Sequence, residues 1–104
     1  MRQAAITILL NYSILLLDKP DPEGKIQIVS ALSGGVLLKE TDAQSYLRLV
    51  TALANVAYQD SDAKEAVVAM TADDIKGSKA PETMEGNDEK TNSLIKEIKK
   101  IILS

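Results

Sequence analysis

Two residue types on which much enzymatic chemistry depends are missing from this sequence. It contains no histidine and no cysteine. A protein without them cannot build a His/Cys zinc site, a Ser-His or Cys-His nucleophile pair, or an imidazole base. Catalysis would have to use carboxylates alone, and the sequence offers no pair of acids placed to share one pocket. We therefore expect a protein that is not an enzyme and that has no metal and no cofactor.

The polar residues with the most informative spacing lie on one predicted helix, at residues 41–58. They step by four, three, four and three positions, which places them on one helix face. We call this set the polar stripe; its members are Gln44, Arg48, Thr51, Asn55 and Tyr58. Amides on such a face can hold an extended peptide backbone, and an arginine can bind a carboxylate through two parallel hydrogen bonds. The alternative for Arg48 is a surface contact with Gln44 or a nearby acid, worth less than about 1 kcal/mol.

An internal repeat adds Asn11 to these candidates. Residues 5–11 (AITILLN) align with residues 49–55 (LVTALAN) at an offset of 44 positions, with Thr, Leu and Asn identical. Offsets in the low to mid forties are typical of armadillo and HEAT repeats. The two segments would be corresponding helices of successive repeats, with Asn11 the counterpart of Asn55. The alternative for both asparagines is a hydrogen bond to a neighbouring loop.

The apolar residues favour closely packed helices over a β-sandwich. They make up 45% of the chain, and neither Phe nor Trp is among them. Leu, Ile, Ala and Val dominate, whereas strands draw more on aromatic residues and Thr. We expect an all-α, armadillo-like helical solenoid of about five helices. They are predicted at residues 2–17, from 22, at 41–58, from 61, and from 87 or 88 to 103.

Local signals mark where these helices begin. Asp21 is predicted to cap the second helix, with Pro22 at its first position. Thr41 and Gln44 have the spacing of a capping box at the start of the third, and Ser61 is predicted to cap a short fourth helix. Its buried candidates are Ala66, Val67 and Met70. The last helix has an apolar face formed by Leu94, Ile95, Ile98, Ile101 and Ile102, with Lys96, Lys99 and Lys100 predicted to face solvent.

Residues 71–90 are predicted to form a mobile loop. They are rich in Asp, Lys, Gly, Thr and Glu, and Pro81 and Gly86 would break a helix. Such a composition favours an exposed and flexible segment. Ile75 is the one residue expected to anchor it.

The amino terminus is predicted to be a buried helix, not a targeting segment. The uncharged run from Ala4 to Leu17 spans 14 residues, too few to cross a bilayer as a helix, and it lacks a small-residue cleavage site. It is apolar on nearly every face, so it needs neighbours on several sides. The formal net charge of −3 also argues against nucleic-acid binding, which requires a concentrated basic face.

Four segments, in this order and at these separations, resemble the PUL domain of the phospholipase A-2-activating protein and ubiquitin-fusion-degradation family. They are LNYS at 10–13, EGKIQ at 23–27, YLRLVTALAN at 46–55 and DSDA at 60–63. The resemblance covers residues 3 to about 72. The remainder is similar only as a loop followed by a last apolar helix.

This resemblance implies a partner and a site. The PUL domain is an armadillo-like solenoid that binds the carboxy-terminal tail of the AAA ATPase valosin-containing protein, in ubiquitin-dependent degradation. The family binds this acidic tail in a positively charged groove, which implies that Arg48 and the polar stripe contact it. The implied location is the cytoplasm, with the nucleus as the second compartment.

The resemblance also implies that residues 1–104 are the carboxy-terminal part of a PUL domain, because Met1 aligns with the middle of the solenoid. The alternative function is a structural one, in which the chain is a terminal cap of a larger solenoid and binds nothing by itself. In either case the first helix should expose apolar surface, or bury it in a dimer.

Overall fold

The computed structural model describes residues 2–19, 21–32, 36–58, 60–78 and 83–103. Over these ranges the regular structure is helical, as predicted, and one isolated β-bridge joins Asp42 to Glu85. The helices are α1 (Arg2–Asp18), α2 (Pro22–Leu32), α3 (Val36–Lys39), α4 (Ala43–Ala57), α5 (Ser61–Gly77) and α6 (Glu89–Leu103).

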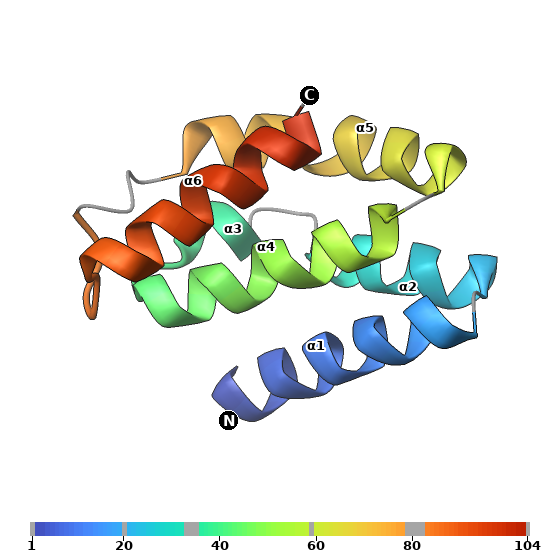
Figure 1. The fold of residues 1–104 in the computed structure, drawn as a ribbon, viewed down its shortest axis with the longest axis horizontal. Helices are drawn as coiled ribbons and strands as arrows, with labels where there is room; N and C mark the ends of the chain where they lie inside the picture. The colour runs from blue at the N-terminus through green and yellow to red at the C-terminus, as the bar shows by residue number, and fades with distance from the viewer. Residues whose placement is uncertain (1, 20, 33–35, 59, 79–82, 104) are drawn as a thin grey trace.

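The helices form two layers, and α4 is the central element. In Figure 1, α1, α4 and α6 lie side by side in one layer, with α4 between the other two. The second layer contains α2, α3 and α5, and α4 also contacts α2 and α5. Because α4 has neighbours on three sides, most of its surface must be apolar.

The sequence of α4 meets this requirement. Tyr46, Val50, Leu53 and Val56 recur at steps of four and three residues, and all of them are fully buried. Burial raises the pKa of the Tyr46 phenol, although its hydroxyl lies 2.7 Å from Ser78 Oγ. The hydrogen bond satisfies the one polar atom of this side chain inside the core.

The start of α4 differs by one residue from the predicted capping box. Asp42 is the N-cap, and its carboxylate accepts hydrogen bonds from the amide and the hydroxyl of Ser45, each at 2.9 Å. The predicted pairing of Thr41 with Gln44 is therefore wrong. The Thr41 carbonyl instead accepts a hydrogen bond from the Glu85 amide at 2.8 Å.

The fourth predicted helix is longer than expected. Its N-cap is Asp60 and not Ser61, because the Asp60 carboxylate accepts the Ala63 amide at 3.0 Å. The helix continues to Gly77, so the prediction of a loop is wrong for residues 71–77.

Tertiary packing explains this extension of α5. Val67, Thr71 and Ile75 recur at steps of four residues, and all three are fully buried. The Thr71 hydroxyl donates to the Val67 carbonyl at 2.6 Å, so this residue packs in the core without an unsatisfied polar group. Ile75 is buried as predicted, whereas Met70, predicted to be buried, is 44% exposed.

The segment 83–88, which precedes α6, is attached to the start of α4. Glu85 exchanges backbone hydrogen bonds with Thr41 and Ala43, both at 2.8 Å, and Met84 is buried. Gly86 has a φ of 69°, a backbone conformation that glycine adopts at low cost. Two strong backbone contacts thus hold part of the predicted loop, and residues 79–82 of that prediction lie outside the described residues.

The helices α1 and α2 approach each other closely at Gly24. Asp21 caps α2 as predicted, accepting the Glu23 amide at 3.2 Å. Gly24 is buried, and a Cβ atom built there would overlap the hydroxyl of Tyr12. Position 24 therefore requires glycine, because the Tyr12 side chain occupies the space that a Cβ atom would fill.

The outer side of α1 exposes apolar surface, as predicted, so the prediction of a buried helix holds only for the side toward α4. Ile6, Ser13 and Leu16 are buried on the side toward α4, whereas Ile8 and Leu15 are 67% and 65% exposed. In α6, Ile95 and Ile102 are buried, but Leu94 and Ile101 from the same predicted face are exposed. Each of these helices thus has apolar side chains that the described residues do not cover.

Candidate protein-interaction site

The polar stripe lies on the face of α4 that is open between α1 and α6. Gln44 Nε2 donates to Thr91 Oγ1 of α6 at 2.8 Å, and Asn55 Nδ2 donates to Ser13 Oγ of α1 at 3.2 Å. Near each end of the stripe, therefore, one amide joins α4 to a flanking helix. The polar stripe is therefore bordered by α1 on one side and α6 on the other.

The stripe residues differ in how much of their surface is available. Gln44 and Tyr58 are exposed, while Arg48, Thr51 and Asn55 are half-buried. The Thr51 hydroxyl donates to the Leu47 carbonyl of its own helix at 2.6 Å, so it can only accept a further bond. Arg48, the one cationic member of the stripe, lies near its middle, is half-buried and makes an interaction within the protein.

Asn11 is not brought to the polar stripe. It is exposed on α1, on the side of the helix away from Ile6 and Ser13. Its repeat counterpart Asn55 faces a neighbouring helix, whereas no described residue provides such a neighbour for Asn11. The predicted correspondence in sequence is therefore not a correspondence in environment.

Two adjoining hollows lie at the carboxy-terminal end of the stripe, and sequence reasoning did not find them. One, of about 610 Å³, extends toward Ala54, Ile101 and Lys64, and the other, of about 370 Å³, extends toward Leu17 and Lys25. Their shared lining residues are Asn55, Tyr58, Asp60 and Ser61. The hollows combine residues from α1, α2, α4, α5 and α6, so no local pattern could have indicated them.

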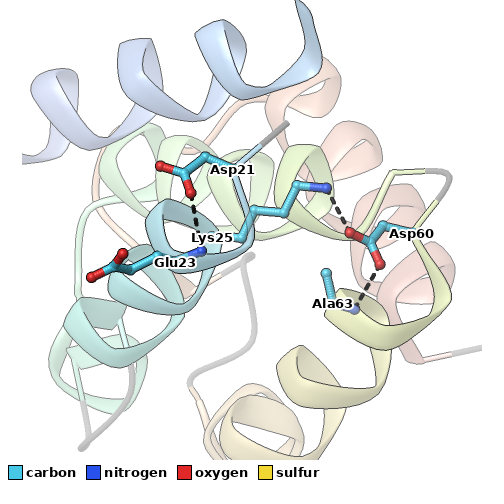
Figure 2. Close-up of polar contacts among 5 residues, drawn as sticks. All are labelled: Asp21, Glu23, Lys25, Asp60 and Ala63. Atoms are coloured by element: carbon cyan, nitrogen blue, oxygen red, sulfur yellow. Dashed lines mark hydrogen bonds and ion pairs between the residues drawn. The ribbon is translucent and has the colours of Figure 1, made fainter. Parts of the chain in front are cut away.

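An ion pair borders these hollows (Figure 2). Lys25 Nζ of α2 lies 2.7 Å from Asp60 Oδ2, with side-chain exposures of 8% and 32%. The hydrogen bond from Lys25, followed by the bond from the Ala63 amide, holds the pKa of Asp60 below its usual value. Asp60 thus caps α5 and fixes the start of α2 against the turn between α4 and α5. The 35-residue separation of the partners hid this pair from sequence reasoning.

Metal binding and membrane crossing each require a particular arrangement of side chains or a particular kind of helix. Within the described ranges, no group of three or more acidic side chains is placed to hold a metal ion. None of the described helices combines the length and the apolar character that crossing a bilayer requires.

Comparison with known proteins gives one match. A family model described as the PUL domain matches residues 1–99, which is nearly the whole chain. The match extends through most of α6. The four short segments that resemble the PUL domain end at residue 63, so the family model also covers the part of the chain where that resemblance was weak. Neither a curated protein nor a solved structure matches the chain significantly.

Proposed function

Because the chain belongs to the PUL domain family, whose domain is a protein-interaction module, we propose that it binds the carboxy-terminal tail of the AAA ATPase valosin-containing protein. This is the partner that the PUL resemblance implies. The protein would then be an adaptor without catalytic activity in ubiquitin-dependent degradation, in the cytoplasm or the nucleus.

The observation that carries this proposal is the open polar face of α4. Arg48 lies between two amides, Gln44 and Asn55, on a face with α1 and α6 on either side. An extended peptide along this face would place its backbone beside the amides and an acidic side chain beside the guanidinium. The bond from Asn55 to Ser13 uses one of two amide protons and fixes the orientation of the group, which reduces the entropy lost on binding.

Calorimetry with a synthetic peptide of the ATPase tail tests the proposal. We expect Arg48→Glu to weaken binding by at least tenfold, because a charge-assisted hydrogen bond becomes a repulsion. Lys76→Glu, on the exposed surface of α5 in the second layer, is the control with the same change of charge and should bind as the wild type does. Equal dissociation constants for wild type and Arg48→Glu would refute the site.

A second candidate function, the structural cap, is favoured by the outer side of α1. The bond between Asn55 and Ser13 joins α4 to α1, and the repeat counterpart of Asn55, Asn11, is exposed. A helix that packed on α1 as α1 packs on α4 would cover Asn11 and Ile8. We propose a preceding helical repeat of a larger solenoid as its occupant.

The two candidates differ in what residues 1–104 do alone. As a cap, this segment would not bind the tail peptide until preceding repeats were supplied. Sedimentation of the wild type beside an Ile8→Lys, Leu15→Lys double variant tests the occupant of the α1 surface. A dimer of the wild type that the double variant abolishes would identify a second copy, not a preceding repeat, as that occupant.

A further inference from the structure

Large apolar side chains from three helices gather around Tyr58. Leu17 at the end of α1, Tyr58 directly after α4, and Ile101 near the end of α6 are 43%, 61% and 57% exposed. Tyr58 lines both hollows, while Leu17 lines one and Ile101 the other. We call the two adjoining hollows the Tyr58 hollow. The apolar surface lies mainly in the larger hollow, which Ile101 lines, whereas the smaller hollow at Leu17 is also lined by polar residues of α2 and α5.

The charges at the border of the Tyr58 hollow already have partners within the protein. The Asp60 carboxylate accepts both Lys25 Nζ at 2.7 Å and the Ala63 amide at 3.0 Å. Lys64 also makes an interaction of its own, and the two α1 residues that line the hollow, Leu16 and Leu17, carry no charge. A charged ligand group would lose its hydration here for little return, whereas an apolar group would release water from the exposed side chains.

We propose that the Tyr58 hollow binds one large apolar side chain of the same peptide whose acidic residue contacts Arg48. This inference rests on the proposed function, since it assigns a second contact to the same bound segment. The partner would be recognised by two features, a carboxylate and a large apolar side chain, and not by negative charge alone.

The geometry of α4 fixes the distance between these two features. Arg48 and Tyr58 are ten residues apart (58 minus 48), and a helix rises 1.5 Å per residue, so they are separated by about 15 Å along the axis of α4. An extended peptide advances about 3.3–3.6 Å per residue. The acidic and apolar residues of the partner should therefore be four or five positions apart.

Variants of the hollow test the proposal with the ATPase tail peptide. Leu17→Ser and Ile101→Ser lie outside the polar stripe, and each should weaken binding by about three- to tenfold because less apolar surface is buried. Met70→Ser, on α5 in the second layer and 44% exposed, is the matched control and should not change binding.

The result separates this proposal from the proposed function. If Arg48→Glu weakens binding while Leu17→Ser and Ile101→Ser bind as the wild type does, the hollow is not a subsite but the peptide-binding function stands. If the wild type does not bind the tail at all, the function itself is refuted. A wild-type dimer that Ile101→Ser abolishes would show that a second copy occupies the hollow, which also overturns the proposal.

A spacing series tests the distance directly. Acetylated and amidated Gly-Ser peptides carrying one Asp and one Leu, two to eight positions apart, would be titrated into ¹⁵N-labelled protein and followed by NMR. We expect the tightest binding at separations of four or five, with amide shifts at Leu17, Tyr58 and Ile101. Equal affinity at every separation would contradict the proposed spacing of four or five positions between the acidic and the apolar residue.

Discussion

The helices α1 and α4 correspond in the internal repeat and lie in the same layer, yet their open surfaces are opposite in character. The helix α4 has α1 and α6 beside it, and what remains open is the polar stripe. The helix α1 contacts α4 and, at Gly24, α2, and its open surface includes Ile8 and Leu15. Similar local sequences therefore have different roles, because the number of neighbouring helices decides which side chains are covered.

The largest expected effect tests the central position of α4. Tyr46→Ala should lower the free energy of unfolding by about 3–5 kcal/mol, because it empties the largest fully buried site in the core. Ile8→Ala, on the open side of α1, should change it by less than about 0.5 kcal/mol. Urea denaturation measures both, and similar losses for the two variants would contradict the contrast between the helices.

The next effect concerns how α1 is attached to the second layer. Gly24→Ala should destabilise the protein by about 1–3 kcal/mol, because the new methyl group would overlap the Tyr12 hydroxyl. The double variant Gly24→Ala, Tyr12→Phe removes that hydroxyl and should recover part of the loss in thermal unfolding. No recovery would mean that the cost arises elsewhere, for example in the backbone of α2.

A smaller effect compares the two asparagines of the repeat. Asn55→Ala should cost about 0.5–1.5 kcal/mol more than Asn11→Ala, because only Asn55 bonds to another helix. Ser13→Ala should cost no more than Asn55→Ala and should not add to it in a double-mutant cycle. Equal costs for Asn11→Ala and Asn55→Ala would remove the distinction between their environments.

The smallest effect is a dependence of stability on pH. The folded-state pKa of Asp60 is lowered, chiefly by the hydrogen bond from Lys25, and that of Asp88 is lowered by hydrogen bonds from the amide and then the side chain of Thr91. Each carboxylate thus stabilises the fold above the usual Asp pKa of about 3.9, and this contribution is lost as the pH falls through the lowered pKa.

Unfolding measured between neutral pH and pH 2 should show this loss. Lys25→Met should raise the pKa of Asp60 toward its usual value. The free energy of unfolding of this variant should therefore fall less between neutral pH and pH 2 than that of the wild type. If the variant and the wild type lose the same free energy of unfolding on acidification, the ion pair does not lower the pKa of Asp60.

What could be predicted from the sequence is what local spacing determines. The steps of three and four residues in the polar stripe predicted one face of one helix. The structure places Gln44, Arg48, Thr51 and Asn55 on α4, and Tyr58 directly after its end. Asp21 before Pro22 likewise predicted the start of α2, because a cap bonds to amides two or three residues away.

The remainder depends on contacts between distant segments. Thr71 and Asp73 suggested a loop, but the burial of Val67 and Ile75 outweighs the weak helix propensity of the residues between them. The Lys25–Asp60 pair and the Tyr58 hollow involve different helices, so no periodic pattern encodes them.

The bonds from Gln44 to Thr91 and from Asn55 to Ser13 have a further consequence for how the protein would report a ligand. They connect α4 to α6 near one end of the polar stripe and to α1 near the other. A ligand lying along α4 would therefore reduce local opening of all three helices, since opening of α1 or α6 would disturb a side chain of the polar stripe. When the ligand binds, amide hydrogen exchange should consequently slow in α1, α4 and α6 together, whereas exchange in α5 should change less. Binding would thus be detected as slower exchange throughout one of the two layers.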